Sequence, residues 1–206
     1  MRVTLLGTGD TTGTPTPNCQ CETCKVARET DVERSRFSLL IENERLDKQL
    51  LIDASPDFRS QFLNTASSLP DEAIITHIHF DHLDGLGNVY RLLDSLTVHA
   101  SGKQDPITGE SVAETISKKY DYLDRIHVDR HDPLKRFKTC GFDVRLLPVT
   151  HPPLDCYGVS IEEPKTGKKV AITGDTSYDI PSRTREHLSD ADLFLADAIV
   201  PASACN

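Results

Sequence analysis

The segment His77-Ile-His79-Phe-Asp81-His82 places three imidazoles and one carboxylate within six residues, at the end of an apolar run. Imidazole nitrogens and carboxylate oxygens bind divalent metals, whereas burying so many polar groups for no such purpose costs free energy. His77 and His79 are two residues apart, so on extended backbone they project to the same side and can bind one cation. Asp81 and His82 follow where a turn is expected, and they can face a second cation. We therefore interpret the segment as a metal-binding motif rather than as four independent core or surface residues.

The elements that must position this motif are short strands. Ala73–Thr76, directly before the motif, is predicted to be a buried strand, and Leu83–Gly85 after it a turn. Similar apolar runs recur along the chain with turn residues between them. The strand candidates are Val3–Leu6, Phe37–Ile41, Leu50–Ile52, Ala73–Thr76, Val144–Val149, Tyr157–Ile161, Val170–Thr173 and Leu193–Ala196.

Helical patterns are fewer than strand patterns. The predicted helices are Asp57–Leu63, Gly87–Leu93, Glu110–Tyr120 and Ser182–Leu188, the last with Pro181 near its start. Strands mixed with helices and joined partly as hairpins predict an α+β fold, with two sheets covered by helices on their outer faces.

Size and charge limit the functions to consider. With 206 residues, of which 37% are hydrophobic, we expect one domain over residues 1–206. No apolar stretch reaches the length of a membrane span, and Met1–Gly7 contains no cleavable apolar region, so we expect a soluble, cytoplasmic protein. Asp and Glu number 32 against 23 Lys and Arg, which disfavours nucleic acid as a partner. A small anionic substrate is still compatible, because bound divalent cations reverse the local charge.

A second group of candidate ligands is formed by three cysteines, Cys19, Cys21 and Cys24. Disulfides between such close neighbours are sterically awkward, so a zinc site is expected, the alternative being three reduced thiols in a loop. Three thiolates are one ligand short of the tetrahedral set of a structural zinc. The other cysteines are expected to be small, buried or partly buried residues: Cys140, Cys156 and Cys205.

Further ligands are expected where other predicted strands end. His151 follows a strand and precedes Pro152-Pro153, a rigid turn that would fix its backbone. Asp175 follows Gly174, which permits a tight turn just before the carboxylate. Asp53 ends a third strand in the same way. Each of these aspartates alone is weak evidence, because Asp is a common turn residue.

Taken in order, these residues and the His77–His82 motif resemble the metallo-β-lactamase-fold hydrolases. The chain is similar in particular to the branch typified by PhnP, the phosphoribosyl 1,2-cyclic phosphate phosphodiesterases. That similarity rests on Gly7-Thr8-Gly9 after the first strand, on the cysteine cluster and on Thr173-Gly174-Asp175-Thr176. The resemblance implies a four-layer αββα sandwich.

The resemblance also implies a role for each candidate ligand. His77, His79 and His151 would hold one metal, and Asp81 and His82 would contribute to a second. Asp175 would bridge the two metals, and Asp53 would support the ligand loop through hydrogen bonds. Cys19, Cys21 and Cys24 would hold a structural zinc.

The implied activity is that of a dinuclear metal-dependent phosphodiesterase acting on a small, open or cyclic, phosphate ester. Two zinc or manganese ions would share a bridging hydroxide as nucleophile, with Asp81 and Asp175 as catalytic carboxylates. Alternatives are a tRNA 3′-processing endoribonuclease, thioester or lactam hydrolysis, and a non-catalytic metal-binding protein, because the fold does not determine the substrate. A homodimer is compatible with the sequence.

One departure from the family pattern concerns the C-terminal region. Family members carry a strand-end histidine there as a ligand of the second metal, and the PhnP type has another that completes the zinc site. Neither is present before Asn206, and we expect an intact reading frame to continue and to supply a strand ending in histidine. Without it we expect weak occupancy of the second metal. The remaining histidines are predicted to be structural or surface residues: His99, His127, His131 and His187.

Overall fold

The computed structural model describes residues 1–89 and 91–198 and contains two mixed β-sheets. The first has the strand order β1-β2-β3-β4-β5-β6. Its strands are β1 (Arg2–Gly7), β2 (Ser38–Asn43), β3 (Lys48–Ile52), β4 (Glu72–Ile74), β5 (Leu96–Ser101) and β6 (Ile126–His131). Strands β1 to β3 are antiparallel, and β3 to β6 are parallel. Parallel neighbours need long crossover connections, which the helices between these strands provide.

The second sheet has the order β11-β10-β9-β8-β7. Its strands are β7 (Phe137–Thr139), β8 (Phe142–Val149), β9 (Cys156–Glu162), β10 (Lys169–Ile172) and β11 (Leu193–Leu195). Strands β7 to β10 form an antiparallel meander, and β11 pairs with β10 in parallel. The two sheets share one core, because β2 and β3 of the first sheet and β8 and β9 of the second contribute fully buried residues such as Ile41, Leu50, Val144 and Ile161.

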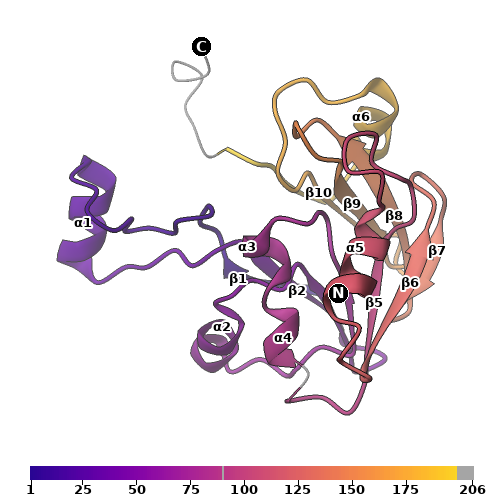
Figure 1. Ribbon diagram of the computed structural model, residues 1–206, viewed down its shortest axis with the longest axis horizontal. Coiled ribbons are helices and arrows are strands. Elements are labelled where there is room, and N and C mark those ends of the chain that lie inside the picture. Colours follow the sequence, from indigo (N-terminus) through magenta and orange to yellow (C-terminus); the bar gives the residue numbers. More distant parts are fainter. Residues whose placement is uncertain (90, 199–206) are drawn as a thin grey trace.

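Helices cover the outer faces of both sheets. On the first sheet, α2 (Phe58–Thr65) contacts β1, and α5 (Val112–Lys119) contacts β5 and β6. On the second sheet, α6 (Ser182–Leu188) contacts β8 and β10. Two four-residue helices, α3 (Phe80–Leu83) and α4 (Leu86–Val89), follow β4 and precede β5 along the chain. Both helices are labelled in Figure 1. The α+β class and the four-layer αββα order predicted from the sequence are confirmed.

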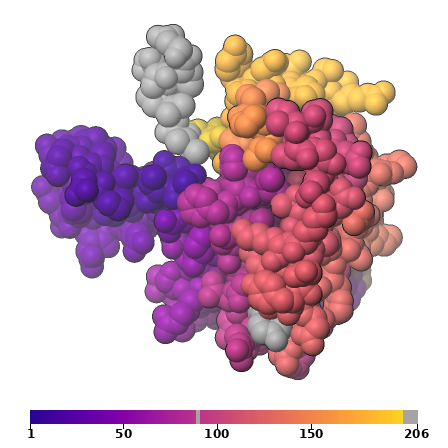
Figure 2. Space-filling view, in the orientation of Figure 1, coloured from indigo at the N-terminus to yellow at the C-terminus, as the bar shows by residue number. Residues whose placement is uncertain are grey.

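Helix α1 (Glu22–Thr30) stands apart from the sandwich in Figure 1, and the N-terminal segment forms a lobe in Figure 2. Of its nine residues only Cys24 and Ala27 are buried, which explains why no apolar period predicted this helix. Strands β5, β6 and β7 were also not predicted, because polar residues such as His99 and Asp129 interrupt their apolar pattern. The predicted helix Gly87–Leu93 is shorter in the structure, where α4 ends at Val89.

Two further expectations concern membrane contact and cysteines. In residues 1–89 and 91–198 no helix has the length and apolar character needed to cross a membrane. Cys140 and Cys156 are buried, as expected. Cys205 lies outside the described residues.

Candidate metal centre

All the strand-end residues singled out in the sequence lie where strands of the two sheets end. His77 and His79 follow β4, and Asp53 follows β3. His151 and Asp175 follow β8 and β10 of the second sheet. The expected turn at Asp81 and His82 is instead the one-turn helix α3, with His79 as its extended N-cap residue. Helix α3 buries both side chains, so it directs them into the protein rather than to solvent.

His77, His79 and His151 form the first group of potential ligands. Nδ1 of His79 lies 3.0 Å from Nε2 of His77 and 3.2 Å from Nε2 of His151. Three nitrogens bound to one tetrahedral ion, each about 2.05 Å from it, would be about 3.3 Å apart. The observed spacing therefore fits a single divalent cation.

The tautomer of His77 also suits a metal ligand. The hydroxyl of Thr76 donates to Oδ2 of Asp53 at 2.7 Å and lies 3.0 Å from Nδ1 of His77. Because the hydroxyl has one proton and gives it to the carboxylate, its oxygen accepts from Nδ1–H of His77. Nε2 is then the unprotonated nitrogen and faces the other two histidines. Burial, followed by the charge of His82, lowers the pKa of His77 and keeps its ring neutral.

His77, His82 and Asp175 form the second group. Nε2 of His82 lies 3.3 Å from Oδ2 of Asp175, and its Nδ1 lies 2.7 Å from Oδ2 of Asp53. Burial lowers the pKa of His82, but the two carboxylates outweigh burial and raise that pKa to about 10. Burial raises the pKa of Asp175, and the hydrogen bond to His82 outweighs it and lowers that pKa to about 2. The same anionic surroundings that favour a proton on His82 would favour a divalent cation.

Asp53 makes hydrogen bonds to residues next to or within both groups. Its Oδ1 accepts the backbone N–H of Thr76 at 2.8 Å, and its Oδ2 accepts from the Thr76 hydroxyl and from His82. The residue is fully buried and has a left-handed backbone, with φ 59°. Asp53 therefore fixes the ring of His82 directly and the hydroxyl of Thr76 beside His77, while its support of metal ligands stays a prediction.

Asp81 lies at the edge of the second group. Its Oδ2 is 3.5 Å from Nε2 of His82, but Asp81 belongs to neither set of mutually close ligand atoms. The hydroxyl of Thr11 donates to the same Oδ2 at 2.7 Å. No sequence signal pointed to Thr11, because 70 residues separate it from Asp81.

The structure brings the three cysteines of the cluster together. Sulfur atoms of Cys19, Cys21 and Cys24 all lie within 4.8 Å of one another, at the start of α1. The backbone N–H of Cys24 is the main cause of a lowered pKa of Cys21, which favours the thiolate that zinc requires. In the described part of the chain no fourth Cys, His, Asp or Glu joins this group.

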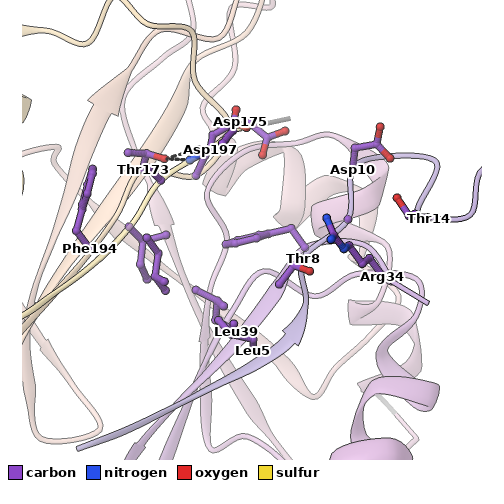
Figure 3. Close-up of a pocket in the computed structure, with 17 residues that line it drawn as sticks. Leu5, Thr8, Asp10, Thr14, Arg34, Leu39, Thr173, Asp175, Phe194 and Asp197 are labelled. Atoms are coloured by element: carbon purple, nitrogen blue, oxygen red, sulfur yellow. Dashed lines mark hydrogen bonds between the residues drawn. The ribbon is translucent and has the colours of Figure 1, made fainter. Parts of the chain in front are cut away.

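A cavity of about 460 Å³ opens beside the second group, between the edge strands β1 and β11. Figure 3 shows Asp175 on one side of it, and Arg34 with Thr8 and Thr14 on another. Apolar side chains including Phe37, Leu39 and Phe194 line the rest. Arg34 is the one cationic side chain among the described residues that line the cavity, and no motif in the sequence pointed to it.

The other histidines lie outside these groups. His99 on β5 is buried, with Nε2 2.6 Å from Oε2 of Glu72 and Nδ1 2.9 Å from Nε2 of His131. His131 stacks on Phe137, with ring centroids 3.6 Å apart. His127 is exposed, and His187 lies on α6. These positions agree with the structural or surface roles expected from the sequence.

Comparison with known proteins decides the family. The protein-family model described as beta-lactamase superfamily domain matches residues 48–203, which is most of the chain. The matched range includes the histidine motif, His151 and Asp175. The chain belongs to the beta-lactamase superfamily. Its domain thus has the metallo-β-lactamase fold, with candidate His and Asp metal sites.

Curated relatives of this beta-lactamase superfamily chain are longer than it. It is 32% identical over 174 residues to the octanoyltransferase of Porphyromonas gingivalis, covering 79% of this chain and 33% of that protein. It is 30% identical over 167 residues to coenzyme PQQ synthesis protein B of Methylobacterium radiotolerans, covering 72% of this chain and 52% of that protein. The chain thus spans about a third to a half of these relatives.

Solved structures show the same fold. A diphosphatase from the PhnP family is 26% identical, with a TM-score of 0.76 and coverage of 93% of this chain and 72% of that chain. Zn²⁺-bound PqqB from Methylobacterium extorquens is 21% identical, with a TM-score of 0.79 and coverage of 96% and 73%. The short form of human tRNase Z is 19% identical, with a TM-score of 0.64 and coverage of 94% and 76%.

Proposed function

We propose that this protein is a dinuclear metal-dependent phosphodiesterase that hydrolyses a small phosphate ester. The observation that carries the proposal is the arrangement of two groups of potential ligands that share His77. The first group consists of the imidazoles of His77, His79 and His151, and the second consists of His77, His82 and Asp175. The 26% identity to a PhnP-family diphosphatase supports phosphorus chemistry over lactam or thioester hydrolysis.

Each side chain of the site has its own role in this proposal. His77, His79 and His151 would hold one divalent cation, and His82 and Asp81 would contribute to the second. Asp175 would be a ligand of both cations. When bound, such cations lower the pKa of a water molecule and stabilise negative charge on phosphoryl oxygens. Asp53 and Thr76 fix the imidazoles that face them. Oδ1 of Asp81 receives no hydrogen bond from the described residues, so it can orient the attacking water or accept its proton.

The cavity favours a small substrate. Its volume of about 460 Å³ lies in the range of small-molecule sites. It carries one guanidinium, that of Arg34, and carboxylates of Asp10, Asp175 and Asp197. A guanidinium suits a phosphate oxygen, while the surrounding carboxylates would repel a long polyanion such as tRNA.

We also propose that Cys19, Cys21 and Cys24 bind a structural zinc. The three sulfurs are close enough to share one ion, and thiolates select zinc over manganese. Replacement of Cys21 by serine should remove one zinc per chain, measured by inductively coupled plasma mass spectrometry of protein purified without added metal. An unchanged zinc content in Cys21→Ser would contradict this site.

A substrate panel tests the enzymatic proposal. With added Mn²⁺ or Zn²⁺, the protein should hydrolyse bis(p-nitrophenyl) phosphate faster than the monoester p-nitrophenyl phosphate, a β-lactam or a thioester. A preference for the lactam or the thioester, or cleavage of precursor tRNA at lower enzyme concentration than any small diester, would assign a different substrate class. The His79→Ala variant serves as the control for contaminating phosphodiesterase.

A further inference from the structure

The carboxylate of Asp81 is held by a residue from a distant loop. Oγ1 of Thr11 donates to Oδ2 of Asp81 at 2.7 Å. Within residues 1–89 and 91–198, this hydroxyl is the one hydrogen-bond donor to that carboxylate. Asp81 itself is 3% exposed, so bulk water has little access to replace the bond.

The loop that carries Thr11 is fixed in place by its own contacts. Nε of Arg36 donates to the carbonyl of Thr11 at 2.9 Å, and Nη1 of Arg36 donates to Oδ1 of Asp57 at 2.9 Å. The loop also runs close to the following segment at Gly9, where an added Cβ would lie 2.5 Å from the carbonyl oxygen of Arg34. A chain of contacts therefore connects the start of α2, through Arg36 and Thr11, to the metal-binding motif.

The bond from Thr11 leaves the carboxylate able to bind a metal. The oxygen that accepts it, Oδ2, lies 3.5 Å from Nε2 of His82. A carboxylate oxygen has two lone pairs, so Oδ2 can accept a hydrogen bond and still turn its other lone pair toward His82. The Thr11 bond fixes the rotation of the carboxylate about the Cβ–Cγ bond, which the four-residue helix α3 alone does not.

We propose that Thr11 is a positioning residue, which sets the orientation of Asp81 for the cation at His82 and Asp175 and for the attacking water. The inference rests on the proposed function. Partners that orient metal ligands are worth about tenfold to a hundredfold in metal affinity or activity. Arg36 acts through Thr11 by holding the loop against the motif.

Thr12 offers a matched control, because it lies in the same loop and contacts other groups. Its hydroxyl donates to Oδ1 of Asp10 at 3.0 Å and lies 3.1 Å from Oγ1 of Thr16. Both Thr11 and Thr12 are exposed, so replacing either by valine changes the surface in the same way. A role limited to loop structure would make the two variants behave alike.

The experiment titrates Mn²⁺ into the metal-free full chain by isothermal titration calorimetry. Mn²⁺ is chosen because it binds thiolates weakly and should not occupy the cysteine cluster. For Thr11→Val we expect the weaker of two Mn²⁺ ions to lose about tenfold in affinity or more, with the tighter ion unchanged. For bis(p-nitrophenyl) phosphate, kcat should fall while KM stays constant. Thr11→Ser should restore both quantities, Thr12→Val should match the wild type, and the metal-free variants should have the same Tm.

Several results would overturn the proposal. These are unchanged affinity for the weaker ion in Thr11→Val, an equal loss in Thr12→Val, or a wild type that binds a single Mn²⁺ per chain. Failure of the proposed function is a separate outcome, because a protein that binds two ions but hydrolyses no diester still yields the titration. In that case the affinity in Thr11→Val alone decides the role of Thr11.

Discussion

Nδ1 of His82 lies 2.7 Å from Oδ2 of Asp53, and both side chains are almost completely buried. The contact turns Nε2 of His82 toward Asp175, whose Oδ2 is 3.3 Å away. Asp53 also accepts two hydrogen bonds from Thr76. One carboxylate therefore orients a histidine of each ligand group, His82 directly and His77 through Thr76.

Replacement of Asp53 by asparagine should weaken metal binding more than it disturbs the fold. An amide has one oxygen, so it cannot accept all three hydrogen bonds that the carboxylate accepts. We expect Mn²⁺ affinity to fall by about tenfold to a hundredfold, as for other residues that orient metal ligands. Calorimetric titration measures this, and circular dichroism of the variant provides the control. An Mn²⁺ affinity equal to that of the wild type would show that Asp53 does not act through the ligands.

Removal of Asp175 should cost more activity than removal of Asp53, because Asp175 is proposed to contact both cations. Turnover of bis(p-nitrophenyl) phosphate by Asp175→Ala and Asp53→Ala provides the comparison, with metal content measured on the same samples. Asp175 is also partly exposed, whereas Asp53 is fully buried, so Asp53→Ala should have the lower Tm. Equal losses of activity with unchanged metal content would contradict these assignments.

Arg34 should contribute to substrate binding rather than to metal binding. We expect Arg34→Ala to raise KM for a diester by about tenfold, the value of one charge-assisted contact, with Mn²⁺ affinity unchanged. Arg59→Ala is the matched control, because Arg59 is an exposed arginine on α2 that does not line the cavity. Steady-state kinetics of both variants test this prediction. An equal KM for Arg34→Ala and the wild type would show that Arg34 does not contribute to substrate binding.

Glu72 should make stability depend on pH in the acidic range. Hydrogen bonds from His99 and Thr139 outweigh burial and lower the pKa of Glu72 from 4.5 to about 2. Because its pKa is lower in the folded protein, ionised Glu72 stabilises the fold. This contribution is present in full above pH 4.5 and is lost as the pH falls through 2. Glu72→Gln should therefore lower the free energy of unfolding by about 2 kcal/mol at pH 7, and by less at pH 3.

Urea denaturation of wild type and Glu72→Gln at both pH values measures this difference. A difference in unfolding free energy that is constant from pH 7 to pH 3 would indicate that the charge of Glu72 does not contribute.

Most positions in the candidate site could be predicted from the sequence because strand periodicity is local. His77, His151, Asp53 and Asp175 each follow an apolar run, and the end of a strand fixes where the next side chain lies. The bridging role of Asp175 and the number of metals stay predictions, as does the single domain.

Other features depend on contacts between distant residues and left no local pattern. The hydroxyl of Thr11 contacts Asp81 across 70 residues, and Glu72 contacts His99 across 27. Strand β6 alternates polar and apolar residues at the edge of a sheet, so it lacks the continuous apolar run of β2. Helix α1 buries little surface, and its cysteines rather than its apolar residues mark its position.

Two cations bound by these residues are proposed to support phosphodiester hydrolysis. Stepwise addition of Mn²⁺ to metal-free protein, with turnover of bis(p-nitrophenyl) phosphate measured at each step, tests this proposal. We predict that turnover rises with added metal and saturates at two equivalents per chain. Absence of turnover at saturating Mn²⁺, or saturation at one equivalent, would contradict the claim.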